Sequence, residues 1–171
     1  MSKAPPRKRL LQALGGLFRS RDLEALGYSR TNLPRLLKHG QVERVSRGLY
    51  RPVTSDTTEH FTLAAVAKRV PKGVVCLLYA LAFHGIGTQL PREIWIAIDR
   101  KARKPRLLDL PVRIVRFSGA AISCGVQEIL VEGVPVRITS PARTVVACFR
   151  FRKKVGLDVA LEARHAALDQ R

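Results

Sequence analysis

The chain contains little cysteine and no long apolar run. Its three cysteines, Cys76, Cys124 and Cys148, are widely spaced among apolar residues and form no CxxC pair. This pattern argues against disulfides and structural zinc, and it predicts three buried packing cysteines in a reducing compartment. No apolar run reaches the ~18 residues that cross a bilayer, and no secretory cleavage site follows the basic N-terminus. We therefore expect a cytoplasmic protein that does not enter a membrane.

Patterns that support catalysis are also scarce. The four histidines, His39, His60, His84 and His165, show no metal-ligand spacing, and no serine lies in a nucleophile-elbow context. His84 is therefore interpreted as a capping or partly buried side chain. We expect no enzyme, no metal and no cofactor.

Two further motifs have a competing chemical interpretation. Gly85–Gly87 lacks the third glycine of a phosphate-binding loop and follows a predicted helix, so we interpret it as a helix end and turn. Glu93, Asp99 and Lys101 flank a predicted strand end and leave open a metal-dependent nuclease, in which the two carboxylates would bind Mg²⁺.

Acidic residues are few, which leaves a strongly basic chain. Its 171 residues include 31 Lys and Arg against 13 Asp and Glu, a net charge of +18. This excess indicates a polyanionic partner, with nucleic acid as the first candidate. Residues 1–55 carry 12 Lys and Arg against 3 acids, and residues 56–171 carry 19 against 10. The excess is therefore shared between both halves, and we expect contacts from both.

Residues 17–52 predict two short helices followed by a two-stranded ribbon. Ser20 is expected to cap the first helix, Leu23 and Leu26 to form its buried stripe, and Gly27 to end it with a positive φ. This outline is typical of a winged helix-turn-helix.

The second helix is expected to bury Leu33, Leu36 and Leu37. Because Pro34 belongs in a first turn, Asn32 is the predicted cap. The opposite side, with Arg30, Thr31, Arg35 and Lys38, is the candidate DNA-recognition face.

The ribbon is predicted from strands at 41–45 and 49–51 with a turn at 46–48. Its candidate DNA-contacting cations are Arg44, Arg47 and Arg51. The alternative is a structural helix pair and hairpin whose charges are simply solvated.

Secondary phosphate contacts are predicted in two other places, each with solvated charge as the alternative. The first is the N-terminal arm and the start of a helix at 7–15. The second is a loop with five cations in seven residues. The residues are Lys3, Arg7, Lys8 and Arg9 in the arm, and Arg100, Lys101, Arg103, Lys104 and Arg106 in the loop.

The second half predicts a mixed α/β domain, so the fold class is α+β, with a winged helix-turn-helix at 1–54 and a basic domain at 55–171. The boundary falls in the turn-rich segment 52–58. Helices are expected from Thr57 or Thr58 to Arg69, at 75–83, from Ser140 to about Phe149 and from Gly156 onward. Strands are expected at 92–98, 112–117, 126–131 and 134–139, the last two joined by Glu132–Gly133.

The order of these segments resembles the AbiEi family of antitoxin and transcriptional repressor proteins from type IV toxin–antitoxin and phage-defence systems. The resemblance is carried by LEALGYSRTNLPRLLKHGQVERVSRGLYRP, then by ALAFHGIGTQLP, EIWIAI, VRIVRFSG, VEGVPVRITSPARTVVACFRFR and KVGLDVALEA.

The resemblance implies an N-terminal winged helix that binds inverted repeats in its own promoter, with Ser29 and Asn32 joining Arg30, Thr31, Arg35 and Lys38 at the major groove. Because one module reaches only a short stretch of DNA, we expect two copies on a palindromic site. It also implies a second domain that neutralises a nucleotidyltransferase-like toxin, not necessarily in a stable complex. The chain departs from the family at Ala147, where an acidic residue is common, and it ends at Arg171, where members continue with further helices, so we expect a shortened form. An RNA-binding or protein-interaction module remains the alternative class.

Overall fold

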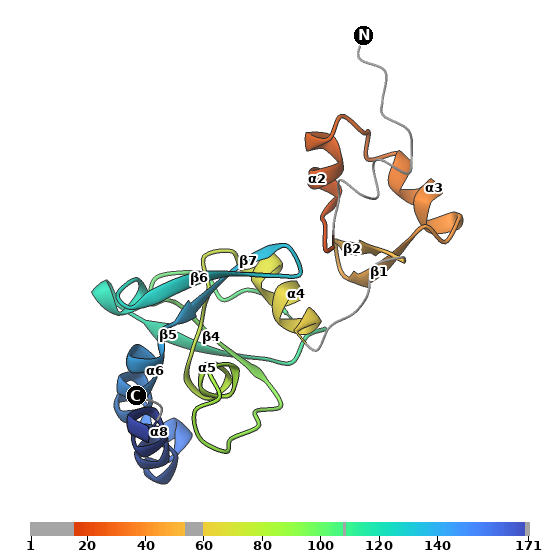
Figure 1. Ribbon diagram of the computed structural model, residues 1–171. Helices are drawn as coiled ribbons and strands as arrows, with labels where there is room; N and C mark the ends of the chain where they lie inside the picture. Colours follow the sequence, from red (N-terminus) through yellow and green to blue (C-terminus); the bar gives the residue numbers. More distant parts are fainter. Residues whose placement is uncertain (1–15, 54–59, 108, 170–171) are drawn as a thin grey trace. The chain divides into compact units, whose positions relative to one another are not determined.

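The computed structural model describes residues 16–53, 60–107 and 109–169 (Figure 1). The described chain forms two compact units. The first contains residues up to Arg69 together with Leu130–Pro135, and the second contains Val70–Ile129 and the residues from Val136 onward. Both units combine helices with a sheet, which confirms a mixed α/β chain.

Some of the predicted features fall outside the described residues. These are the basic arm with its helix at 7–15, the cap at Thr57 or Thr58, and the linker that contains the proposed domain boundary. The division into 1–54 and 55–171 therefore stays a prediction.

Between residues 16 and 69, the described part of the first unit forms two short helices, a hairpin and a further helix. Strands β1 and β2 are antiparallel, with Val42 opposite Pro52 and Glu43 opposite Arg51. The elements are α2 (Ser20–Ala25), α3 (Asn32–Lys38), β1 (Val42–Ser46), β2 (Leu49–Pro52) and α4 (Phe61–Arg69).

Glycines end the first two helices in the same way. Gly27 and Gly40 have φ values of 81° and 62°, which glycine adopts without a Cβ penalty. After α3 the Gln41 N–H donates to the Leu36 carbonyl and the Gly40 N–H to the Leu37 carbonyl, the Schellman pattern. The predicted helix ends are therefore confirmed.

The predicted caps are each wrong by one residue. Arg19, not Ser20, is the N-cap of α2, because its extended backbone places its N–H 2.9 Å from a carboxylate oxygen of Asp22. Thr31, not Asn32, is the N-cap of α3. Pro34 still lies in the first turn, as its missing N–H requires.

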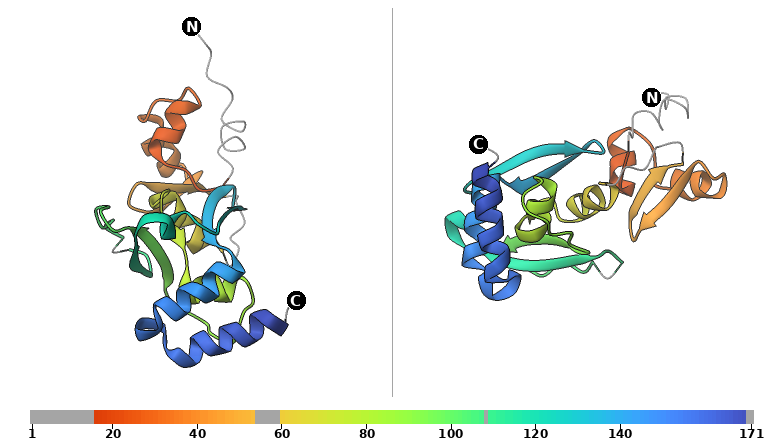
Figure 2. Two further views of the ribbon diagram at one scale, coloured as in Figure 1. Left: turned by 90° about the vertical axis from the view of Figure 1, so that its left-hand side faces the viewer. Right: turned by 60° about the horizontal axis from the view of Figure 1, so that its bottom comes forward.

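The second unit contains a five-stranded mixed sheet in the order β5-β4-β3-β7-β6. Strand β4 runs parallel to β5 and antiparallel to β3, and β3 runs parallel to β7. The helices α6 and α8 lie side by side in Figures 1 and 2. The elements are β3 (Val74–Val75), α5 (Leu77–Phe83), β4 (Ile94–Asp99), β5 (Val112–Phe117), the 3₁₀ helix η1 (Gly119–Ile122), β6 (Val126–Val131), β7 (Val134–Thr139), α6 (Pro141–Arg150), α7 (Arg152–Val155) and α8 (Leu157–Asp169).

Strand β3 replaces the first turn of a predicted helix. The helix is predicted from Val75, but Val74 and Val75 pair with Ala97 and Ile96 of β4. Two β-branched residues followed by an extended Cys76 suit a strand, and its place at the centre of the sheet outweighs the local helical pattern.

The other strand predictions agree with the structure. Strands β5, β6 and β7 have the predicted bounds, and β4 begins two residues later than predicted. Glu132 and Gly133 both have positive φ, 52° and 71°, as a two-residue type I′ hairpin turn requires. Pro141 is the first residue of α6, as predicted.

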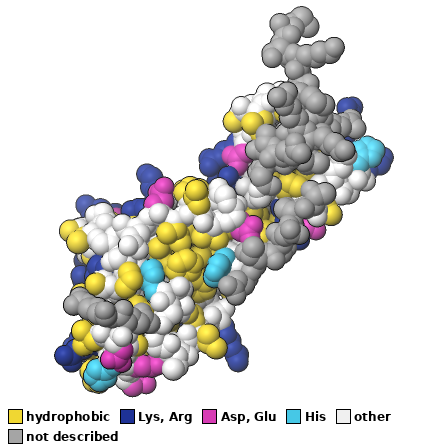
Figure 3. Space-filling view, in the orientation of Figure 1, with side chains coloured by type: hydrophobic (Ala, Val, Ile, Leu, Met, Phe, Trp, Pro, Cys, Tyr) yellow, Lys and Arg dark blue, Asp and Glu magenta, His cyan; other side chains and the backbone are white. Residues whose placement is uncertain are grey.

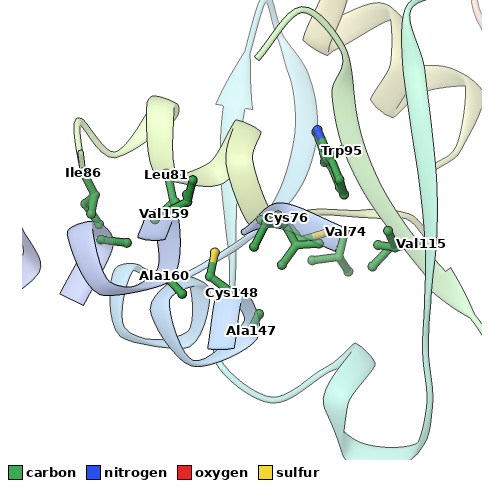
Figure 4. Close-up of a cluster of buried hydrophobic side chains, with 14 of the residues drawn as sticks. Val74, Cys76, Leu81, Ile86, Trp95, Val115, Ala147, Cys148, Val159 and Ala160 are labelled. Atoms are coloured by element: carbon green, nitrogen blue, oxygen red, sulfur yellow. The ribbon is translucent and has the colours of Figure 1, made fainter. Parts of the chain in front are cut away.

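The core of the second unit gathers side chains from α5, β3, β4, β5, α6 and α8 (Figure 4). Cys76 and Cys148 are buried in this core, but Cys124 is exposed, so the prediction of three buried cysteines is wrong for Cys124. Burial raises the pKa of Cys76 and raises that of Cys148 to about 12. Both thiols therefore stay protonated and inert. Among the described residues, no helix is long and apolar enough to span a bilayer.

Candidate nucleic-acid interface

A small apolar core fixes α2, α3 and the hairpin of the first unit. It is completed by Phe18, whose backbone exchanges two 2.9 Å hydrogen bonds with Tyr50 and whose ring lies 5.9 Å from the Tyr50 ring. This bridge adds a third extended segment beside the hairpin. The buried members are Phe18, Leu23, Tyr28, Leu33, Leu36 and Val42.

The polar side of α3 is exposed, as the apolar spacing predicts. Leu33 and Leu36 are buried, whereas Leu37 is half-buried and Leu26 of α2 is 37% exposed. The expected stripe of α2 is therefore correct for Leu23 and wrong for Leu26. Because the chain turns at Gly27, Leu26 lies past the end of the helical face.

The cations of this face differ in how they are held. Arg35 and Lys38 lie one turn apart on α3 and are exposed, and within the described residues neither forms an ion pair. Arg30 is exposed too, but its guanidinium Nε lies 2.8 Å from a carboxylate oxygen of Glu24. A DNA phosphate or base would have to compete with Glu24 for Arg30.

The uncharged candidates lie at the start of α3. The Ser29 hydroxyl oxygen is 2.9 Å from the Thr31 hydroxyl and accepts a hydrogen bond from the Thr31 N–H at 3.3 Å. Asn32 is half-buried. Ser29 and Thr31 therefore shape the turn that leads into the helix, in addition to being exposed.

The three hairpin arginines have three different environments. Arg47 is exposed in the turn between β1 and β2, and Arg44 is exposed on β1. Arg51 is partly covered, since it pairs with Glu43 across the hairpin and stacks 4.9 Å from the centre of the Phe61 ring. Arg51 thus contributes to the folding of the unit, a role that the sequence did not predict.

The end of α4 is tied to α2 and the hairpin by polar contacts. Lys68 Nζ lies 2.9 Å from a carboxylate oxygen of Asp22, and Arg69 donates to the Ser46 hydroxyl at 3.0 Å. Burial raises the pKa of Asp22, but the hydrogen bonds from Arg19 N–H and Lys68 outweigh it and hold this pKa below its ordinary value. These links join α4 to α2 and to β1.

The cationic loop between β4 and β5 is exposed at all five predicted positions, which are Arg100, Lys101, Arg103, Lys104 and Arg106. Lys and Arg side chains recur along the visible edges of both units in Figure 3.

The structure does not bring together the two carboxylates of the nuclease alternative. Glu93 precedes β4 and pairs with Arg113 at 3.0 Å, whereas Asp99 ends the same strand and accepts the Lys101 N–H at 2.8 Å. A six-residue strand separates two carboxylates that a metal would need side by side. No cluster of potential metal ligands occurs in the described part of the chain.

His84 and a groove are two further features of the second unit. His84 ends α5 and its Nε2 lies 2.8 Å from the Thr139 carbonyl oxygen, as expected for a capping histidine. A groove of about 490 Å³ carries one charged lining residue, Arg164, and therefore lacks the paired groups of a catalytic site. Its lining residues are Ile86, Pro141, Ala142, Val145, Arg164, Ala167 and Leu168.

The exposed face of α3 and the hairpin lie within a region that matches a known sequence family. Residues 8–53 match the family model described as "Transcriptional regulator, AbiEi antitoxin". This region is similar to the AbiEi antitoxins. The resemblance predicted from the sequence is confirmed here, and the AbiEi description is regulatory rather than enzymatic.

A structural comparison extends beyond the AbiEi-like region. The chain resembles the crystal structure of the RV2827C protein from Mycobacterium tuberculosis, with a TM-score of 0.57 and 15% sequence identity. The likeness covers 85% of this chain and 62% of that one, so the chain spans less than two thirds of its structural relative. At this identity the likeness concerns the fold alone. No curated protein matches the sequence.

Proposed function

We propose that the protein is a DNA-binding transcriptional autorepressor and antitoxin of a type IV toxin–antitoxin system. In this proposal α2, α3 and the hairpin are a winged helix-turn-helix that binds inverted repeats in the protein's own promoter. The observation that carries the proposal is the exposed cationic side of α3 inside the region that matches the AbiEi model.

The exposed side chains divide into two roles. Arg35 and Lys38 are the best base-reading candidates, because both extend from the helix that would enter the major groove. Arg47 at the hairpin tip and Arg44 beside it are assigned to phosphates of the neighbouring backbone. Arg30 joins the recognition face if it exchanges Glu24 for DNA.

One module covers a short site, so two copies are expected on a palindrome. Half-sites should then lie about 10 bp apart, or a multiple of that spacing, because equivalent faces of the duplex recur once per turn. The second unit is assigned the antitoxin role against a nucleotidyltransferase-like toxin, without a stable complex being required.

Binding to upstream DNA tests the repressor proposal directly. The full chain is titrated against its own upstream duplex and a scrambled duplex of equal length, across roughly 50 to 200 mM salt, where phosphate-dominated binding falls steeply. A preference for the upstream duplex that persists at high salt is expected. Equal binding to both duplexes, lost together as salt rises, would refute sequence-specific repression, and stronger competition by matched duplex RNA would favour an RNA-binding function instead.

A further inference from the structure

The cationic loop between β4 and β5 is held in place by a residue outside it. Arg116 of β5 directs Nη1 toward three backbone carbonyl oxygens, at 3.2 Å for Asp99, 2.7 Å for Arg100 and 2.9 Å for Ala102. Because Nη1 carries two hydrogens, two of the three carbonyls share one of them, and the contacts together tie the Arg116 side chain to the backbone of the turn. The loop therefore begins in a defined conformation.

Two more backbone contacts fix the same turn. The Lys101 N–H donates to the Asp99 carboxylate at 2.8 Å, and the Arg100 N–H donates to the Phe117 carbonyl at 2.8 Å. Asp99 is the one acidic residue between positions 99 and 106, and it is occupied by the turn. Its carboxylate is therefore engaged with the backbone of the loop.

A second cationic segment is anchored at the same point of the sheet. Residues 150–154 have the sequence RFRKK, and its four cations are exposed. The Phe151 ring within it stacks on the Phe117 ring with centroids 5.3 Å apart, and Phe117 is 2% exposed. Because Phe117 also accepts the Arg100 N–H, two segments about 50 residues apart in sequence are both fixed at the end of β5.

We infer that these two segments form one binding surface for the phosphate backbone of duplex DNA, separate from α3. We call Arg100–Lys104 together with Arg150–Lys154 the β5 cationic surface. Each segment carries four cations in five residues, and like charges clustered so densely repel one another unless an anionic partner neutralises them. The inference rests on the proposed function, because DNA bound by the first unit would be present at high local concentration.

The placement of the aromatic side chain favours a duplex over a single strand as the ligand. Proteins that bind single strands stack bases on exposed aromatic rings. In the β5 cationic surface the aromatic residue is Phe151, and its ring is used against Phe117. The contact should therefore depend on phosphate charge and not on base sequence.

The test compares variants of the full chain in which glutamine replaces exposed cations. Arg152→Gln, Lys153→Gln and Lys154→Gln are combined in one variant, and Arg103→Gln with Lys104→Gln in another. A control that matches the triple variant in charge combines Lys72→Gln, Arg92→Gln and Arg164→Gln, which are exposed cations elsewhere in the second unit. Thermal unfolding of each variant is measured as well, because Arg152 donates to the Phe149 carbonyl at 3.0 Å and Lys154 Nζ lies 5.9 Å from the centre of the Phe151 ring, and binding is compared where all variants are folded.

The readout is binding to a scrambled duplex as a function of salt. Removing one cation that neutralises a phosphate should reduce the slope of log K against log salt by about 0.9, so the slope of the triple variant should fall by about 2–3 and that of the control should stay near wild type. A triple variant with the slope of its control would overturn the inference. Duplex RNA that binds more tightly than DNA would overturn the assignment of the ligand.

The positioning role of Arg116 and the proposed function are tested separately. As a single change, Arg116→Gln should weaken DNA binding. Added to the Arg103→Gln, Lys104→Gln variant, it should weaken binding no further, and additive losses would contradict a positioning role. If the wild type shows no upstream preference while the triple variant still has a reduced slope, the repressor proposal fails and the β5 cationic surface stands.

Discussion

The exposed face of α3 and the β5 cationic surface both carry clustered Lys and Arg, but different interactions fix them. The α3 face is set by helical periodicity over a small core, with Leu33 and Leu36 buried below it. The β5 cationic surface has no such periodicity, and it depends on Arg116 and on the stack of Phe117 with Phe151. The α3 face therefore depends on residues close together in sequence, whereas the β5 cationic surface depends on contacts between residues far apart in the chain.

Weakening the apolar core below α3 should disturb the α3 face and not the β5 cationic surface, and this is the largest difference that we expect between them. Leu23→Ala should cost about 2–5 kcal/mol of folding free energy, because Leu23 is fully buried. Denaturant unfolding measures this cost, and preference for upstream DNA should fall with it. The control is Leu26→Ala at the end of the same helix, at a 37% exposed position, which should cost under about 1 kcal/mol. If both substitutions cost the same free energy of unfolding, Leu23 and Leu26 would not differ in packing as described.

Changing the helix face itself should affect recognition without affecting folding. Arg35→Ala or Lys38→Ala should cost about 1–3 kcal/mol of binding to the upstream duplex if the side chain reads a base. Binding to scrambled DNA should change much less. The measurement is a paired titration of both duplexes, and uniform weakening of the two would reassign the residue to phosphate contact.

Arg51 and Arg47 of the hairpin should respond differently to substitution by alanine. Arg51→Ala should destabilise the first unit by about 1 kcal/mol, because the variant cannot stack on Phe61 or pair with Glu43. Arg47→Ala at the exposed turn should weaken binding to all duplexes alike, with a flatter salt dependence. Thermal unfolding together with titration separates these effects. If Arg47→Ala destabilised the unit and Arg51→Ala only weakened binding, the roles of the two arginines would be exchanged.

The smallest effect concerns pH. The pKa of Asp22 is lowered in the folded protein, so its contribution to stability is complete above the ordinary carboxyl pKa and is lost as pH falls through the lowered value. Asp22→Asn should remove this acid-dependent part, at a cost of about 1 kcal/mol at neutral pH. Unfolding of both proteins between pH 7 and pH 2 gives the comparison, and identical pH profiles would exclude Asp22 as the source.

Much of the fold could be predicted because its signals are local. Strands β5, β6 and β7 follow alternating patterns, and Glu132–Gly133 supplies a turn whose positive φ values suit the twist of the two strands. The α3 face follows from leucines at helical spacing. Strand β3 could not be predicted, because two residues carry no periodicity and its stability depends on partners at 96, 97 and 138.

The sequence by itself determined the net charge, the AbiEi-like order of α2, α3 and the hairpin, and which side of α3 is polar. These depend on composition and on neighbours within one or two helical turns. The tertiary structure alone decided which cations are exposed and which are engaged: Arg51 meets Phe61, Arg30 meets Glu24, and Arg116 holds the loop at 99–102. The reason is physical, since an arginine's partners depend on distances that the fold creates between residues far apart in the chain.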